Sequence, residues 1–217
     1  MAARTPFIML IRYDQPDLLL PRYYYPVRVR GSYPSLLWKR DNDSDRVKAN
    51  FSRTSVRMRI SFDIDDTLVC LPTVPTEQYI PWWHRWRYTE PLRRGTKALL
   101  EALVQRRCRI WIYTTSYRSP RYLKGWFRSF GIAIEGVVNQ AWHEQRVGTR
   151  GPSKYPPAFG IDLHVDDSAG VAMEGEDHQF AVVVVSPEDP GWAARVLAAV
   201  DACMDLSAAA PLAARRR

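Results

Sequence analysis

The sequence predicts a three-layer α/β fold, in which a parallel sheet of about five strands lies between two layers of helices. The first observation is that short apolar runs alternate with longer segments of helical periodicity from residue 58 onward. The second is that polar side chains gather where several of these runs end, as they do at the ligand-binding edge of a parallel sheet. A chain of 217 residues, of which 46% are hydrophobic, is long enough for one such domain.

Each element follows from its own pattern along the chain. The expected strands are the apolar runs at residues 59–64, 108–114, 134–139, 162–167 and 180–186. The expected helices are the amphipathic stretches at residues 92–107, 119–131 and 189–206. Strands and helices that alternate in this way are typical of a Rossmann-like sheet with helices on both faces. We therefore expect one domain over residues 58–206.

The two ends of the chain differ from this domain. Residues 1–57 contain many prolines and an excess of basic side chains, without a sustained helical or alternating period. Two interpretations remain: Met58 is the natural first residue, or residues 1–57 form a basic, tyrosine-rich arm that binds a partner. In either case we expect this leader to be largely disordered and dispensable for activity. Residues 207–217 are rich in Ala and Arg, and we expect a flexible tail.

Composition excludes several classes of protein. The net charge of +8 invites a nucleic-acid partner, but its excess lies in residues 1–57 and in the final three arginines. Cys70, Cys108 and Cys203 are far apart and form no CxxC pair, which argues against a disulfide framework or a zinc site. No apolar run approaches the roughly 20 residues of a membrane span, and the apolar start is too short for a signal peptide. We therefore expect a cytoplasmic protein without a membrane partner.

Charged and hydroxyl side chains follow three of the expected strands. The first strand runs into DIDDT (63–67), the second into YTTS (113–116) and the fourth into VDDS (165–168), with Lys154 in the loop before the fourth. An unpaired buried carboxylate costs several kcal/mol, so the aspartates need a partner. Carboxylates, hydroxyls and a lysine on one rim are the groups that bind a hard cation and a phosphate. The sequence therefore predicts a site for Mg²⁺ and a phosphorylated substrate.

These segments resemble, in order, the four motifs of phosphatases of the haloacid dehalogenase superfamily. The resemblance covers about residues 58–203 and rests on four motifs. The residues that match the motifs are Asp63, Asp65 and Thr67 in SFDIDDTL, Thr114 in IWIYTTS, Lys154, and the paired Asp166 and Asp167 in LHVDDS. Four motifs in order, each at a strand end, are far more specific than a single DxD.

The resemblance implies a mechanism as well as a fold. Asp63 would attack phosphorus and carry the phosphoryl group, while Asp65 would protonate the leaving oxygen and later deprotonate water. Thr114 and Lys154 would hydrogen-bond the transferring oxygens. Asp167, with Asp166, would hold Mg²⁺ together with the Asp63 carboxylate and the Asp65 carbonyl. The second aspartate, Asp65, favours phosphate-ester hydrolysis over dehalogenation.

Alternatives remain open at single positions. Thr115 or Ser116 competes with Thr114 for the hydroxyl role, and Thr115 is a candidate for binding substrate; Arg150 competes with Lys154. A calcium loop starting at Asp63 is excluded, because its sixth and twelfth positions need Gly and Glu. Asp66 is expected to be a turn or N-cap residue.

Aromatic and basic side chains are concentrated in PWWHRWRY, residues 81–88. In one interpretation these rings cover the edge of the sheet. In the other, Trp82, Trp83 or Trp86 forms a stacking wall beside the site, and Arg85 and Arg87 bind an anion.

The intervals between the first three motifs leave no room for a separate cap domain. The resemblance then implies a capless type, whose open site accepts phosphate groups on large substrates or is covered by a partner subunit in an oligomer. Two other functions remain: a phosphatase that acts on phosphorylated nucleic-acid ends, suggested by the leader, the arginine tail and the Trp/Arg loop, and a non-catalytic binding module. The loops show no pattern that identifies the substrate.

Overall fold

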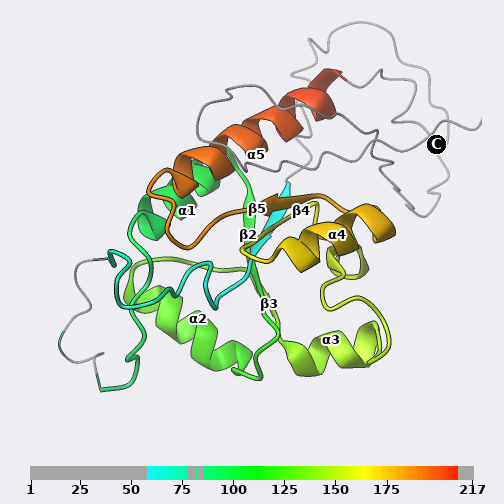
Figure 1. Ribbon diagram of the computed structural model, residues 1–217. Coiled ribbons are helices and arrows are strands. Elements are labelled where there is room, and N and C mark those ends of the chain that lie inside the picture. Colours follow the sequence, from blue (N-terminus) through cyan, green and yellow to red (C-terminus); the bar gives the residue numbers. More distant parts are fainter. Residues whose placement is uncertain (1–57, 78–81, 83–85, 210–217) are drawn as a thin grey trace, which may run out of the picture.

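A computed structural model describes residues 58–77, 82 and 86–209 of the chain, and the structure below is that of these residues (Figure 1). The leader at residues 1–57, the last eight positions of the expected tail, and Trp83 and Arg85 lie outside the described residues.

The sheet has five strands, all parallel. They are β1 (Arg59–Phe62), β2 (Arg109–Tyr113), β3 (Gly136–Val138), β4 (Leu163–Asp166) and β5 (Val182–Val184), in the spatial order β3-β2-β1-β4-β5. Each strand lies within one of the five predicted runs, so the predicted α/β fold with a parallel Rossmann-like sheet is confirmed. β1 occupies the centre and pairs with β2 on one side and β4 on the other.

Five α-helices join these strands. They are α1 (Thr96–Gln105), α2 (Pro120–Ser129), α3 (Gln140–Arg146), α4 (Ala169–His178) and α5 (Trp192–Ala209), and a 3₁₀ helix, η2 (Pro156–Phe159), precedes β4. α1, α2 and α5 were expected, whereas α3 and α4 were not. α3 is too short to show a helical period, and α4 contains two glycines and few apolar residues on its buried side. α5 continues to Ala209, past the expected domain boundary at residue 206.

Local capping explains where several helices begin. The side chain of Asn139 accepts the N–H of Trp142 at the start of α3. Ser119 caps α2 in the same way, and its hydroxyl accepts the N–H of Tyr122. Each cap satisfies a donor that the first helical turn leaves without a partner, and so stabilises the turn from strand to helix by about 1 kcal/mol.

Alternate residues of each strand face opposite layers. On β1, Ile60 and Phe62 join the large core cluster with α1, α2 and α5, whereas Ser61 bonds to His164 of β4 on the other face. The second face is filled by smaller clusters around Tyr113 and Val182, next to α3 and α4. Figure 1 shows α1, α2 and α5 on one side of the sheet and α3 and α4 on the other. The molecule therefore has three layers.

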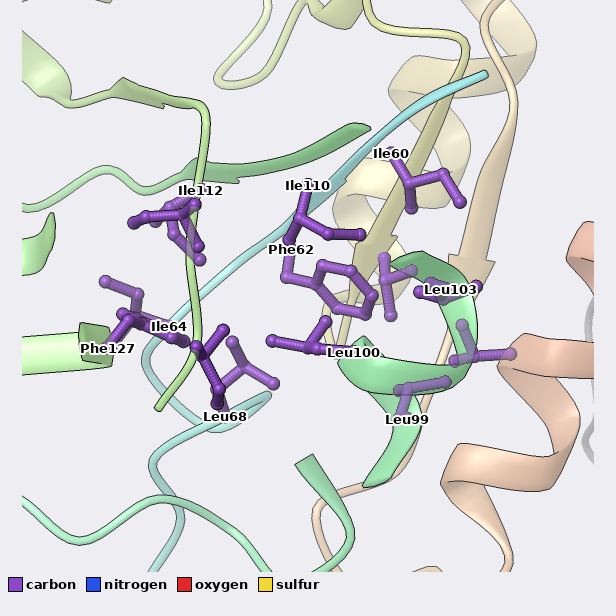
Figure 2. Packing of buried hydrophobic residues seen from close by; sticks show 14 of the residues in the cluster. Ile60, Phe62, Ile64, Leu68, Leu99, Leu100, Leu103, Ile110, Ile112 and Phe127 are labelled. Atoms are coloured by element: carbon purple, nitrogen blue, oxygen red, sulfur yellow. The ribbon is translucent and has the colours of Figure 1, made fainter. Parts of the chain in front are cut away.

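The larger cluster holds the first layer of helices to the sheet. Figure 2 shows Ile60, Phe62, Ile110 and Ile112 of the sheet pointing toward the leucines of α1 and toward Phe127 of α2. Ile64 and Leu68, just beyond β1, belong to the same cluster and are completely buried. Burial of each such side chain contributes about 1.5–3 kcal/mol. This packing fixes the end of β1 and the turn that follows it.

The strand order reverses at β1. The chain proceeds outward from β1 to β2 and β3, then crosses over to β4 and continues outward to β5. Because parallel crossovers are right-handed, the two directions place their helices on opposite faces. The point where the order reverses opens a crevice at the carboxyl ends of the two central strands, which is where ligands bind in such sheets. In this chain the two strands are β1 and β4.

The segment between β1 and α1 contains no cap domain in its described residues. It begins with a tight turn in which the N–H groups of Leu68 and Val69 both donate to the carbonyl of Ile64. Asp66 has a φ of 59° in this turn, a left-handed conformation that Asp tolerates. Asp66 is thus a turn residue, as expected. The described residues of the segment also form two isolated bridges, Asp65 with Val69 and Thr76 with Arg93.

Of the helices in the described part of the chain, none has both the length and the apolar character needed to cross a membrane.

The packing of α1 predicts a large loss of stability for Leu100→Ala. Leu100 is 1% exposed within the main cluster, whereas Val104 of the same helix is 55% exposed. We expect Leu100→Ala to lower the free energy of unfolding by about 2–5 kcal/mol, because a cavity replaces the side chain. Val104→Ala, the control, should change it by less than about 0.5 kcal/mol. Urea unfolding followed by circular dichroism measures both, and equal losses in the two variants would contradict this description of the core.

Candidate active site

The side chains that the motifs single out meet at the carboxyl edge of the sheet. Asp63 directly follows β1, Thr114 directly follows β2, and Asp166 and Asp167 lie at the end of β4. The ladder continues one residue past each of the first two strands, since the N–H of Asp63 donates to Val165 and that of Thr114 to Val138. These extra hydrogen bonds hold both backbones in register where the functional side chains begin.

Lys154 reaches this edge from the loop before β4. Its Nζ donates to Oδ1 of Asp63 at 2.7 Å and to the carbonyl of Tyr113 at 2.8 Å, and lies 3.4 Å from Oδ2 of Asp166. The Lys154 side chain is only 2% exposed, whereas Arg150 is exposed. The structure therefore places Lys154, rather than its competitor Arg150, against Asp63.

The loop that carries Lys154 is fastened on both sides. Glu174 of α4 accepts hydrogen bonds from the N–H and hydroxyl of Ser153 and from the N–H of Lys154. The hydroxyl of Tyr113 accepts the N–H of Tyr155. Neither Glu174 nor Tyr113 was predicted to support the site. Only the packing of α4 against this loop reveals the role of Glu174, because its own sequence context has no motif.

Three carboxylates converge next to Lys154. One oxygen each of Asp63, Asp166 and Asp167 lies within 4.8 Å of the others. Asp166 accepts the N–H of Ser168 through Oδ1, and its Oδ2 lies 2.9 Å from Nε2 of His164. Oδ1 of Asp167 accepts the hydroxyl of Thr67 at 3.1 Å. These contacts orient the acids toward a common point.

Their protonation behaviour reflects this crowding. Burial raises the pKa of Asp63 above its ordinary value, and the charge of Asp166 adds to the effect, although Lys154 opposes it. Burial and the charge of Asp166 raise the pKa of Asp167 to about 6. Burial also works to raise the pKa of Asp166, but His164, Lys154 and the Ser168 N–H together hold it below its usual range. At Asp63 and Asp167, the cations and hydrogen-bond donors of the protein therefore offset only part of the cost of a buried negative charge.

This donor set fits a hard divalent cation. Magnesium prefers carboxylate oxygens in compact sites, and the three aspartates supply oxygens alone. A cation among them would relieve the repulsion that raises the pKa of Asp63 and of Asp167. Asp63, Asp166 and Asp167 are thus the residues that would hold it; the carboxylate of Asp65 is directed elsewhere.

A buried polar chain lies beneath Asp166. Oγ of Ser61 is 2.8 Å from Nδ1 of His164, whose Nε2 is the group that meets Asp166. His164 and Ser61 are completely buried on adjacent strands. Sequence reasoning missed both, although a polar alternation inside two otherwise apolar strands is the signal that could have revealed them.

Asp65 takes part in a separate, outer network. Arg118, in the loop after β2, donates from Nη1 to Oδ2 of Asp65 and from Nη2 to Oδ1, both at 2.9 Å. Nη2 also donates to Oε1 of Glu90 at 2.6 Å. The hydrogen bond to Asp65 raises the pKa of Arg118 above its ordinary value. Sequence reasoning did not identify Arg118 or Glu90, and the position of Arg118 two residues after Ser116 was the available signal.

The three hydroxyl candidates differ in exposure. Thr114 is completely buried; its Oγ1 accepts the N–H of Ser116 and lies 3.2 Å from the Ser116 hydroxyl. Thr115 is exposed and Ser116 is half-buried. The Thr114 hydroxyl thus faces the interior of the turn, next to Ser116.

The aromatic loop is described only in part. Trp82 and Trp86 are 77% and 78% exposed, and Arg87 is exposed with its guanidinium 5.8 Å from the centre of the Tyr88 ring. The high exposure of Trp82 and Trp86 is unlike that of rings that cover the edge of a sheet. Trp83 and Arg85 lie outside the described residues, so their suggested roles stay predictions.

A pocket of about 350 Å³ adjoins the acidic cluster. It lies between the turn after β1 and the loop after β5, and Asp167 forms part of its lining; Asp66, Thr73 and Glu188 contribute further polar groups. The pocket offers space next to the cluster.

Comparison with known proteins identifies no family for this chain. No protein-family model matches it, and no curated protein matches it. Two solved structures show a distant likeness. A Pnkp1/Rnl/Hen1 complex has 13% identity over 82% of this chain and 58% of that chain, with a TM-score of 0.42. A putative 3-deoxy-D-manno-octulosonate 8-phosphate phosphatase from Vibrio cholerae has 10% identity over 65% of this chain and 82% of that chain, with a TM-score of 0.34.

This chain therefore spans less than two thirds of the first of these chains. At such TM-scores neither likeness supports a conclusion about activity, which depends on the geometry of the site.

The raised pKa of Asp167 predicts a pH-dependent stability. A folded-state pKa of about 6, against an ordinary 3.8, means that the folded protein binds this proton more tightly, so stability falls as the pH rises from about 4 through 6. Without added metal, we expect Asp167→Asn to be more stable than the parent at pH 7.5 by about 1 kcal/mol, a value reduced for the partial exposure of the group. At pH 4 the difference should vanish.

Urea unfolding at both pH values in the presence of EDTA measures this difference. Asp177→Asn on the exposed side of α4 is the matched control and should match the parent at each pH. An Asp167→Asn variant that is less stable than the parent at pH 7.5 would contradict the assigned repulsion.

Proposed function

We propose that this protein is a Mg²⁺-dependent phosphatase of the haloacid dehalogenase type, which hydrolyses a phosphate monoester through a phosphoryl-aspartate intermediate. The observation that carries the proposal is the contact between Lys154 and Asp63 at 2.7 Å, with Asp166 and Asp167 beside it. A buried lysine and three carboxylates at the end of two central strands have no structural purpose that apolar residues would not serve better.

Asp63 is the nucleophile in this proposal. One of its oxygens attacks phosphorus as the bond to the leaving oxygen breaks, and the phosphoryl group passes to the carboxylate. Lys154 keeps the Asp63 carboxylate oriented, because it bonds to Oδ1 and is itself held by the Tyr113 carbonyl. A bound Mg²⁺ would neutralise the negative charge of the aspartates and of the phosphate, so that the two can approach each other.

Asp65 lies two residues further on and outside the buried cluster. Its side chain is 52% exposed, which suits a group that must exchange protons with a leaving alcohol and with water. In the first step Asp65 takes a proton from solvent on an oxygen that has left Arg118, and gives it to the leaving oxygen; in the second it takes a proton from the water that attacks the phosphoryl-aspartate. The second step restores the Asp63 carboxylate and releases phosphate.

Lys154 and the hydroxyl-bearing turn after β2 supply the remaining interactions. In this proposal Lys154 turns the N–H that now lies near Asp166, at 3.4 Å, to a phosphoryl oxygen next to Asp63, where negative charge increases in the transition state. Thr114 or Ser116 would provide a second donor. Thr115, Arg85, Arg87 and Trp83 remain predicted contacts of the substrate.

The alternative of a phosphatase for nucleic-acid ends rests on residues 1–57, on the final arginines and on the Trp/Arg loop. The first two lie outside the described residues; in the described part of the loop Trp82 and Trp86 are exposed, and none of the hydrogen bonds and ion pairs above joins Trp86 to the acidic cluster. The binding-module alternative leaves the buried acids unexplained. We therefore retain the simple phosphate-monoester hydrolase, which acts on a substrate whose non-phosphate part enters the pocket beside Asp167.

The assigned nucleophile predicts that Asp63→Asn abolishes activity. An amide cannot attack phosphorus, so we expect at least a ~100-fold loss in the hydrolysis of 4-nitrophenyl phosphate with Mg²⁺ present. Asp177→Asn, an exposed aspartate of α4, is the control and should retain the parental rate. Chelation of the metal should also remove the activity of the parent. Full activity of Asp63→Asn would contradict the proposed function.

The burial of Lys154 predicts that its substitution lowers both the catalytic rate and the stability, whereas substitution of the exposed Arg150 lowers neither. Lys154→Met should lower kcat by about 10²–10³-fold, as removal of one donor to the developing charge does in other sites. It should also lower the free energy of unfolding by about 3–5 kcal/mol in EDTA, since Asp63 and Asp166 lose their cation. Arg150→Met should change neither quantity. Steady-state rates and urea unfolding measure both, and a loss confined to Arg150→Met would reverse the assignment.

A further inference from the structure

The contact between Arg118 and Asp65 has the geometry of a two-pronged clamp. Nη1 and Nη2 of Arg118 bond to the two different oxygens of Asp65, each at 2.9 Å. Such a fork fixes the plane of a carboxylate as well as its position, which a single hydrogen bond or a lysine cannot do. An exposed aspartate in a turn otherwise samples several rotamers.

Arg118 is itself fixed at both ends. Its carbonyl accepts the side-chain N–H of Asn139, and the next residue, Ser119, caps α2. At the other end Nη2 bonds to Glu90, whose carbonyl in turn accepts the indole N–H of Trp126 of α2. The clamp therefore joins the turn after β1 to the loop after β2 and the segment before α1.

Stability alone does not account for this arrangement. The side chain of Arg118 is 23% exposed and that of Asp65 is 52% exposed. Water screens the half-exposed carboxylate of Asp65, so the gain in stability from this pair is limited, although its bidentate geometry makes it stronger than an ordinary surface pair. What the clamp does determine is the orientation of the Asp65 carboxylate.

We propose that Arg118 is a positioning residue for the acid–base step: its fork holds the Asp65 carboxylate in one orientation, from which one oxygen leaves Arg118 to pass a proton to the leaving group, and Glu90 holds Arg118 in place. This inference rests on the proposed function. If Arg118 acts through Asp65, its loss harms the reaction most when the leaving oxygen needs a proton. If it instead binds the phosphate directly, its loss harms all phosphate esters equally.

The test compares two esters that share the phosphate and differ in the leaving group. Nitrophenolate leaves readily without a proton, whereas the leaving oxygen of phenyl phosphate depends more on one. The value of kcat/KM reports the step in which the leaving group departs. We expect Arg118→Gln to lower kcat/KM by about 10–100-fold for phenyl phosphate and by less than about 3-fold for 4-nitrophenyl phosphate, within the range of general acid catalysis.

Three further variants make the result specific. Asp65→Asn should show the same selective loss, at least as large as that of Arg118→Gln. Arg118→Lys keeps the charge without the fork and should recover only part of the rate. Arg121→Gln, an exposed arginine in the first turn of α2, is the matched control and should leave both esters unaffected.

Glu90→Gln tests the anchor without touching Asp65. We expect a smaller selective loss for phenyl phosphate, about 3–10-fold, because Arg118 loses a charged partner but keeps the clamp. If Arg118→Gln proves too unstable to assay, Glu90→Gln alone tests whether Arg118 positions Asp65.

The positioning role would be overturned if Arg118→Gln lowered kcat/KM equally for both esters, or if neither Arg118→Gln nor Glu90→Gln lowered it for phenyl phosphate. Either result would leave the proposed phosphatase activity intact. A parent protein that hydrolyses neither ester with Mg²⁺ would overturn the proposed function itself. The thermal midpoints of Arg118→Gln and Arg121→Gln should agree within a few degrees, which excludes unfolding as the cause of a selective loss.

Discussion

The burial of Asp63 and Asp166 beside a single lysine is the interaction on which the rest of the site depends. Taking these carboxylates out of water costs several kcal/mol each, and Lys154 offsets only part of that cost. His164 and the Ser168 N–H offset a further part at Asp166. The cost that remains, at Asp63 and Asp167, is one that a bound cation would lower.

The inner and outer parts of the site differ in burial and in how they are held. The inner part, around Asp63, Lys154 and Asp166, is buried and attached to the sheet through strand ends whose hydrogen bonds continue past the last strand residue. The outer part, around Asp65 and Arg118, is partly exposed and held by ion pairs. In the proposed mechanism, electrostatic stabilisation benefits from the first environment and proton exchange from the second.

The two faces of the sheet contribute differently to this arrangement. The large apolar cluster of α1, α2 and α5 sets the position of β1 and of the turn that carries Asp65. The opposite face is less uniformly apolar, since Ser61, His164 and Tyr113 place polar groups there. It is from this second face that Glu174 and Tyr113 fix the loop of Lys154. Stability comes mostly from one layer and the orientation of the lysine from the other.

The sequence by itself determined the five strands, three of the helices and the positions of Asp63, Thr114 and the Asp166–Asp167 pair at strand ends, because periodicity and strand termini are local properties. It did not reveal α3 or α4, whose apolar patterns are short or weak. Only the tertiary structure decided that Lys154 rather than Arg150 meets Asp63, that His164 supports Asp166, and that Arg118 clamps Asp65. Each of these contacts joins residues on different strands or loops, and the strand order that brings them together is fixed by packing of the whole sheet rather than by any local pattern.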